Sequence, residues 1–122
     1  MLEDTATIAK SIASIEEFAS GLNDTPPTAK SINQTNRWVT TKEKHVTNTQ
    51  HIVAQYFLTQ GIKGSNRDYT NQLITAHKVM VAAMKCTQDA DPATAENLKN
   101  AIYDLYRAYE GKEPVLEHDH KD

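Results

Sequence analysis

Apolar residues recur with the period of an α-helix in the first part of the chain. One stripe, with spacings of three and four, runs through residues 5–22 and comprises Ile8, Ile12, Ile15, Ala19 and Leu22. This spacing predicts an amphipathic helix with one buried face. Asp4 or Thr5 can cap its start, and the polar, proline-containing run 23–27 ends it.

The next segment, residues 28–60, contains neither glycine nor proline. Four apolar residues recur in it at every seventh position: Ile32, Val39, Val46 and Val53. A heptad of this kind predicts a helix, and an unbroken one of this length would span about 50 Å. The segment is also rich in threonine, which lowers helix propensity. A strand reading of residues 38–41 and 45–47 therefore remains open.

Two further helices are predicted in the second half of the chain. After a turn at residues 61–64, Ser65 and Asp68 resemble a capping box that opens a helix ending near Gln88. Its stripe comprises Tyr69, Leu73, Ala76, Met80 and Ala83. Asp91 and Pro92 suit the N-cap and first position of the last helix. The stripe of that helix comprises Leu98, Ile102, Leu105 and Tyr109.

Four amphipathic helices joined by short loops predict an all-α fold, an antiparallel up-down four-helix bundle with one over-long helix at residues 28–60. We expect residues 1–113 to form a single domain and residues 114–122 to form a flexible, acidic, histidine-containing tail.

The N-terminal residues, the apolar runs and the cysteine content indicate where in the cell the protein is found. The sequence opens with Met1 and Leu2 followed by two acids, unlike the basic start of a signal peptide. The longest apolar run, residues 79–84, is far shorter than a membrane span. Cys86 is the single cysteine, so the chain cannot form an internal disulfide. These features predict a cytoplasmic protein with no membrane contact.

Charge is distributed unevenly around a net charge of −3. Residues 28–88 carry eight Lys and Arg but only two Asp and Glu, whereas both flanking parts are acidic. A basic middle can bind an anionic partner. Attraction between helices of opposite sign inside one bundle explains the same pattern.

The sequence offers little material for catalysis or metal binding. His45, His51, His77 and His118 lack the His or Glu partner, three or four residues away, that a helical metal site uses, and His120 has one only in the tail, at Glu117. His118 and His120 could hold a metal only weakly. Cys86 has no histidine and carboxylate nearby in sequence to activate it. The prediction is therefore a protein that is not an enzyme and has no cofactor.

Nucleic-acid binding is an alternative because basic and polar residues share one side of the long segment. Lys30, Arg37 and Lys44 recur there at helical spacing, and Trp38 lies beside them. Such side chains contact phosphates and base edges.

The sequence favours a small non-enzymatic interaction protein, such as an adaptor, assembly factor or inhibitor, of a size that a phage or mobile element could encode. We expect a homo-oligomer, in the simplest case a dimer, that also docks on another protein. The predicted interface residues are Val39, Val46, Val53, Tyr56, Tyr103 and Tyr106. The alternatives are a nucleic-acid-binding accessory protein, as above, and a helical-bundle enzyme or metal-binding protein.

Overall fold

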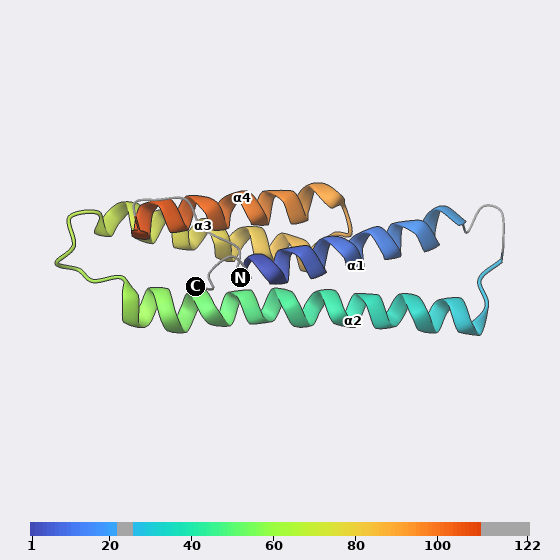
Figure 1. The fold of residues 1–122 in the computed structure, drawn as a ribbon. Helices are drawn as coiled ribbons and strands as arrows, with labels where there is room; N and C mark the ends of the chain where they lie inside the picture. The colour runs from blue at the N-terminus through green and yellow to red at the C-terminus, as the bar shows by residue number, and fades with distance from the viewer. Residues whose placement is uncertain (22–25, 111–122) are drawn as a thin grey trace, which may run out of the picture.

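The computed structural model describes residues 1–21 and 26–110, and these form an antiparallel, up-down helical bundle (Figure 1). The helices are α1 (Leu2–Gly21), α2 (Ala29–Ile52) with its continuation η1 (Val53–Gly61), α3 (Tyr69–Gln88) and α4 (Pro92–Glu110). The predicted all-α bundle is confirmed. Because no strand occurs in these residues, the strand reading of the threonine-rich segment is wrong. The predicted tail, 114–122, lies outside them.

The first helix begins earlier than its apolar stripe indicates. α1 starts at Leu2, so Asp4 lies in its first turn and does not cap it. Thr5 is also helical, and its hydroxyl donates to the Leu2 carbonyl at 2.6 Å. Ile8 and Ile12 are fully buried, as the stripe predicts, whereas Ile15 is half-buried and Ala19 is exposed.

The over-long helix is continuous. Thr28 caps α2 in a reciprocal capping box with Ser31, and the helix passes directly into η1, which ends at Gly61. Figure 1 shows α1 along the N-terminal half of α2, while α3 and α4 lie towards the η1 end. Val46 and Val53 are therefore fully buried, whereas Ile32 and Val39 remain 46% and 36% exposed.

Polar residues share the buried face of α2 with these valines. Lys42 and Thr49, which alternate with the heptad valines, are both buried. The Lys42 ammonium lies 3.6 Å from the Glu43 carboxylate and donates to the Asp89 carbonyl at 3.5 Å. The buried face is thus wider and more polar than a stripe of single valines.

The end of the long helix, η1, has the wider turn of a π-helix. The Thr59 hydroxyl donates to the carbonyl of Ala54, five residues earlier, at 2.6 Å. Phe57 packs edge-on against Tyr106 and Tyr109 of α4, with ring centroids 5.9 and 5.1 Å apart. These aromatic contacts fix η1 against the bundle.

The predicted start of the third helix is wrong, whereas that of the fourth is confirmed. Ser65 does not cap α3, which starts at Tyr69 after a turn in which the Asn66 side chain accepts from the Asp68 amide at 2.8 Å. That local bond belongs to a turn, and α3 begins three residues later than predicted. At α4, the Asp91 carboxylate accepts from the Ala93 amide at 2.9 Å, as an N-cap residue does.

Candidate functional site

A buried carboxylate links the start of α1 to the middle of α2. Asp4 is only 7% exposed. Its carboxylate contacts His45 Nδ1 at 2.7 Å and accepts from the Asn48 amide at 2.9 Å and the Thr49 hydroxyl at 3.4 Å. Burying an ionised carboxylate is costly unless its oxygens are hydrogen-bonded. Three donors from one helix meet that requirement.

This network also sets the orientation of the His45 ring. A carboxylate oxygen only accepts hydrogen bonds, so the tautomer of His45 that fits this contact has its proton on Nδ1 and donates to Asp4 Oδ1. The second ring nitrogen, Nε2, is left without a partner in the network, and the His45 side chain is 32% exposed. A carboxylate behind an imidazole is a common device for fixing the tautomer and direction of a functional histidine.

The exposed side of His45 borders a hollow on the surface of α2. The hollow has a volume of about 530 Å³ and is lined by Lys44, His45, Thr47, Asn48 and His51. The His51 ring packs edge-on against Tyr56, with centroids 6.4 Å apart. The lining therefore combines one ammonium, two imidazoles, an amide and a hydroxyl.

Sequence reasoning missed this cluster because Asp4 and His45 are 41 residues apart. A signal did exist in the first helix. Asp4 lies four residues before Ile8 and so extends the buried stripe to an acidic residue. An acid on a buried stripe requires a partner, but only the packing of α1 on α2 identifies His45 as that partner.

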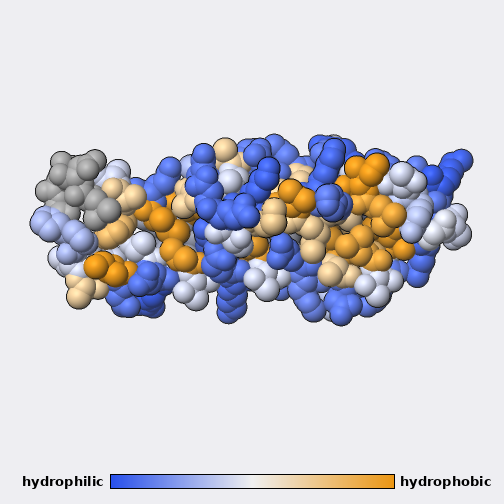
Figure 2. Space-filling model, turned by 180° about the vertical axis from the view of Figure 1, so that it is seen from behind, coloured by the Kyte–Doolittle hydropathy of each residue, from blue (hydrophilic) through white to orange (hydrophobic). Residues whose placement is uncertain are grey.

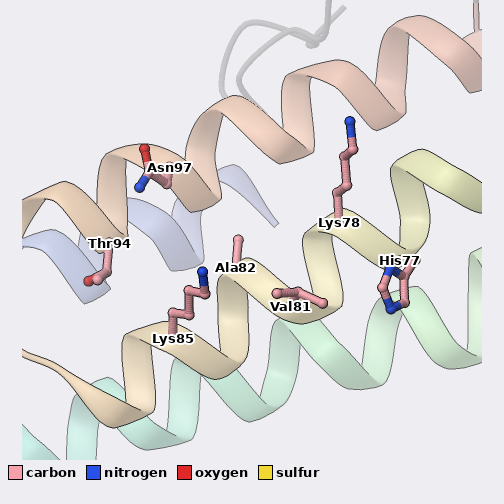
Figure 3. A pocket seen from close by; sticks show the side chains of 7 residues that line it. All are labelled: His77, Lys78, Val81, Ala82, Lys85, Thr94 and Asn97. Carbon is pink, nitrogen blue, oxygen red and sulfur yellow. The ribbon is translucent and has the colours of Figure 1, made fainter.

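A second hollow lies between α3 and α4 and has a volume of about 280 Å³ (Figure 3). Figure 3 shows Lys78 and Lys85 extending from α3 towards α4 on either side of Ala82. The remaining lining residues are His77, Val81, Thr94 and Asn97. This hollow has an apolar floor and a basic rim.

Cys86 lies inside the bundle. It is fully buried, and its thiol donates to the Thr94 carbonyl at 3.4 Å. Burial raises the pKa of the Cys86 thiol, which the hydrogen bond and Lys42 only partly offset. Because the thiolate is the nucleophile and the metal ligand, a buried protonated thiol suits a packing role.

The predicted interface residues divide into three groups by burial. Val46 and Val53 are fully buried in the core of the chain, so they have no surface to offer a partner. Val39 and Tyr56 are exposed. The other two are half-buried on α4: Tyr106 packs against Phe57, and Tyr103 lies under the Arg107 guanidinium.

The residues predicted to contact nucleic acid lie on the outer side of α2. Lys30, Arg37 and Lys44 are exposed, as their shared helix face indicates. Trp38 is half-buried, and the Lys10 ammonium of α1 lies 5.7 Å from its ring centroid. Trp38 thus packs between the first two helices.

Neither a metal cluster nor a membrane span is found in the described part of the chain. Among residues 1–21 and 26–110, no group of three or more His, Cys, Asp and Glu side chains could hold a metal ion. Over the same ranges, no helix combines the length and apolar character that crossing a membrane requires.

Comparison with known proteins changes the functional interpretation. The model of the family described as nickel-containing superoxide dismutase matches residues 2–113, a span that includes every helix described above. No curated protein and no solved structure matches the chain. The family is one of enzymes. The prediction of a non-enzymatic adaptor, assembly factor or inhibitor is therefore wrong, and the enzyme alternative is favoured.

Proposed function

Because the chain belongs to the nickel-containing superoxide dismutase family, we propose that it acts in the enzymatic dismutation of superoxide. This reaction converts two superoxide anions and two protons into dioxygen and hydrogen peroxide. The observation that carries the proposal is the extent of the match, residues 2–113, which covers the whole bundle. Because the match includes all the described helices, the likeness to the family extends over the whole bundle and not over one helix or loop.

The described side chains do not fit a nickel centre. Nickel binds imidazole and thiolate ligands well. The Cys86 thiol is buried and protonated, and His45 uses Nδ1 to contact Asp4. In the described ranges, neither Cys86 nor His45 belongs to a group of three or more His, Cys, Asp or Glu side chains that could hold a metal ion. We therefore propose that the helices form a framework and that the nickel ligands lie outside residues 1–21 and 26–110.

Metal content and superoxide decay, measured together, test this proposal. The chain is purified from cells grown with and without added nickel, bound nickel is measured by plasma mass spectrometry, and superoxide decay is followed by stopped flow. We expect decay to accelerate in proportion to bound nickel. Nickel-replete protein that leaves the spontaneous decay rate unchanged would refute the activity.

A tail variant tests where the ligands lie. Replacing His118 and His120 by alanine removes the histidines that follow the described residues. Loss of bound nickel would support ligands in this segment, and unchanged nickel binding would contradict the proposal, because residues 22–25 and 111–117 contain neither histidine nor cysteine.

We also propose that the chain self-associates. The support is the exposed apolar surface on the part of α2 that only α1 covers, where Ile32 and Val39 reach the surface. A cytoplasmic location, a second protein partner and a nucleic-acid partner stay predictions from the sequence.

A further inference from the structure

We propose that residues 113–117, near the end of the chain, dock in the hollow between α3 and α4. These residues lie outside the described ranges, and the family match ends at the first of them. The sequence alone predicts a flexible tail, because it does not show the surface that this hollow offers. The docking rests on the hollow and on the composition of the segment. Its consequence for nickel rests on the proposed function.

The hollow combines two positive charges with an apolar floor. Lys78 and Lys85 are exposed, and neither forms an ion pair with another residue of the described ranges. Figure 3 shows both side chains extending towards α4, one on each side of Ala82. Val81 and Ala82 are half-buried between them. The hollow therefore fits an occupant whose apolar side chains stand between two negative charges.

The sequence after α4 has this pattern. Residues 113–117 read Glu-Pro-Val-Leu-Glu, with two apolar residues between two glutamates. Pro114 interrupts a helix and favours an extended backbone in the residue before it. When extended, the four steps from Glu113 to Glu117 span about 13 Å. The two lysines are seven positions apart on α3, which is about 11 Å along the helix. Both ion pairs can therefore form at once.

Two hydrogen bonds show how α3 and α4 lie side by side. The Gln72 amide donates to the Ala108 carbonyl at 3.2 Å, and the Cys86 thiol donates to the Thr94 carbonyl at 3.4 Å. Residues 72 and 108 are therefore level near one end of the pair, and residues 86 and 94 near the other. Gly111 follows α4 directly, and glycine readily reverses a chain after a helix. A segment that turns back there runs in the same direction as α3.

The segment is long enough to reach both lysines. In this register Lys78 is level with residue 102 and Lys85 with residue 95, about 12 and 22 Å back from the end of α4 at Glu110. An extended chain of three residues spans about 10 Å and one of seven about 23 Å. Glu113 and Glu117, the third and seventh residues after α4, therefore come level with the two lysines in turn. The length of the side chains makes up for the residues used in the reversal.

Apolar contact is needed as well as charge. Exposed ion pairs contribute little on their own, because water and salt screen them. Val115 and Leu116 are the apolar residues that docking would bring onto Val81 and Ala82, and the removal of apolar surface from water favours the docked state. The combination selects residues 113–117, because no apolar residue follows them before the chain ends at Asp122.

Docking has a consequence for the two histidines of the tail. His118 and His120 follow Glu117, so docking would bring them past Lys85 to the turn between α3 and α4. If these histidines hold nickel, the hollow fixes the metal against the bundle.

Backbone order parameters, measured by ¹⁵N NMR relaxation on the complete, metal-free chain, test the docking. We expect values above about 0.6 at Val115 and Leu116, towards the ~0.85 of a rigid backbone. The double variant Lys78→Glu, Lys85→Glu sets like charges against the two glutamates and should lower both values below about 0.6. Leu116→Asp removes the main apolar contact and should lower the value at Val115 in the same way.

Two further variants separate docking from general effects of charge. Lys30→Glu combined with Lys44→Glu is the matched control, because it makes the same change in net charge on exposed residues of α2 and should leave the order parameters unchanged. Glu113→Lys and Glu117→Lys, added to the double variant of α3, reverse both partners and should restore the order. All the substituted lysines are exposed, so the bundle should stay folded, which circular dichroism checks.

Every outcome decides the proposal. Order parameters below about 0.6 at residues 115 and 116 of the wild type would overturn it. It would also be overturned by order that the double variant of α3 leaves unchanged, or by a charge-reversed chain that stays disordered. The measurement uses metal-free protein, so docking in a chain that binds no nickel would uphold the docking and refute its role for the metal. Nickel binding by a chain whose residues 113–117 stay mobile would refute the docking alone.

Discussion

Cys86 and Asp4 are both buried, yet the surroundings of Asp4 stabilise a charged side chain and those of Cys86 a neutral one. Asp4 is surrounded by donors that stabilise a carboxylate. Cys86 donates to a carbonyl and lies among apolar side chains, an environment that stabilises the neutral thiol. The chain thus keeps its one thiol uncharged inside the core and directs a supported imidazole towards the surface.

The stability of the protein should consequently fall at alkaline pH through Cys86. Its pKa lies above the ordinary value of 9.0 in the folded chain. Between that value and the folded pKa, the unfolded chain holds fewer protons at this site than the folded chain does, so stability decreases as pH rises. The contribution of the Cys86 thiol to the free energy of unfolding is fully present below about pH 9. Above that pH it declines by at most about 1.4 kcal/mol per pH unit.

Urea unfolding at a series of pH values in wild type and in Cys86→Ala measures this contribution. Below pH 9 the two proteins should differ by a constant amount, and above it the wild type should lose stability faster. Tyr106, whose pKa is also raised by burial, titrates in both proteins and cancels in the comparison. Parallel curves across the whole range would contradict the expectation.

At the scale of single helices, the periodicity of apolar residues predicted where the helices lie and which side of each is buried. Three residues of the α4 stripe, Leu98, Ile102 and Leu105, are fully buried as predicted, whereas its last residue, Tyr109, is 38% exposed. The π-helical form of η1 was not predicted, since its extra residue per turn does not disturb a heptad that ends at Val53. The Asp4–His45 pair was not predicted either, because it exists only once α1 packs on α2. Sequence thus indicated the helices and part of their buried faces but not the contacts between helices that build the candidate site.

Gly61, the last residue of η1, has no room for a side chain. A Cβ atom there would lie 2.7 Å from both the Tyr109 hydroxyl and the Tyr56 carbonyl. The carbonyl belongs to the backbone and cannot move aside easily, so we expect Gly61→Ala to lower the free energy of unfolding by about 1–3 kcal/mol. Gly64→Ala is the control, because its new methyl would have no neighbour within 4 Å. Equal thermal stability of the two variants would show that η1 adapts freely.

At the scale of the whole molecule, the helices are staggered along α2. One end of α2 is covered by α1 alone, and the other end adjoins α3 and α4 (Figure 1). The space-filling view from behind shows apolar side chains reaching the surface in separate patches towards both ends of the molecule (Figure 2). Val39 and Val46 occupy the same position in consecutive heptads, yet Val39 is exposed and Val46 is fully buried.

These two valines provide a matched test of self-association. We expect the wild-type chain to scatter light as an oligomer, in the simplest case a two-fold dimer, because a second copy can cover the exposed face of α2. Val39→Glu should shift the mass towards the 13.6 kDa monomer with little loss of stability, since Val39 is exposed. Val46→Glu should instead destabilise the chain by about 3 kcal/mol or more, because it buries an unpaired charge. If the wild type already scatters as a monomer at tens of micromolar, Val39 lies on a free surface and the proposed self-association is refuted.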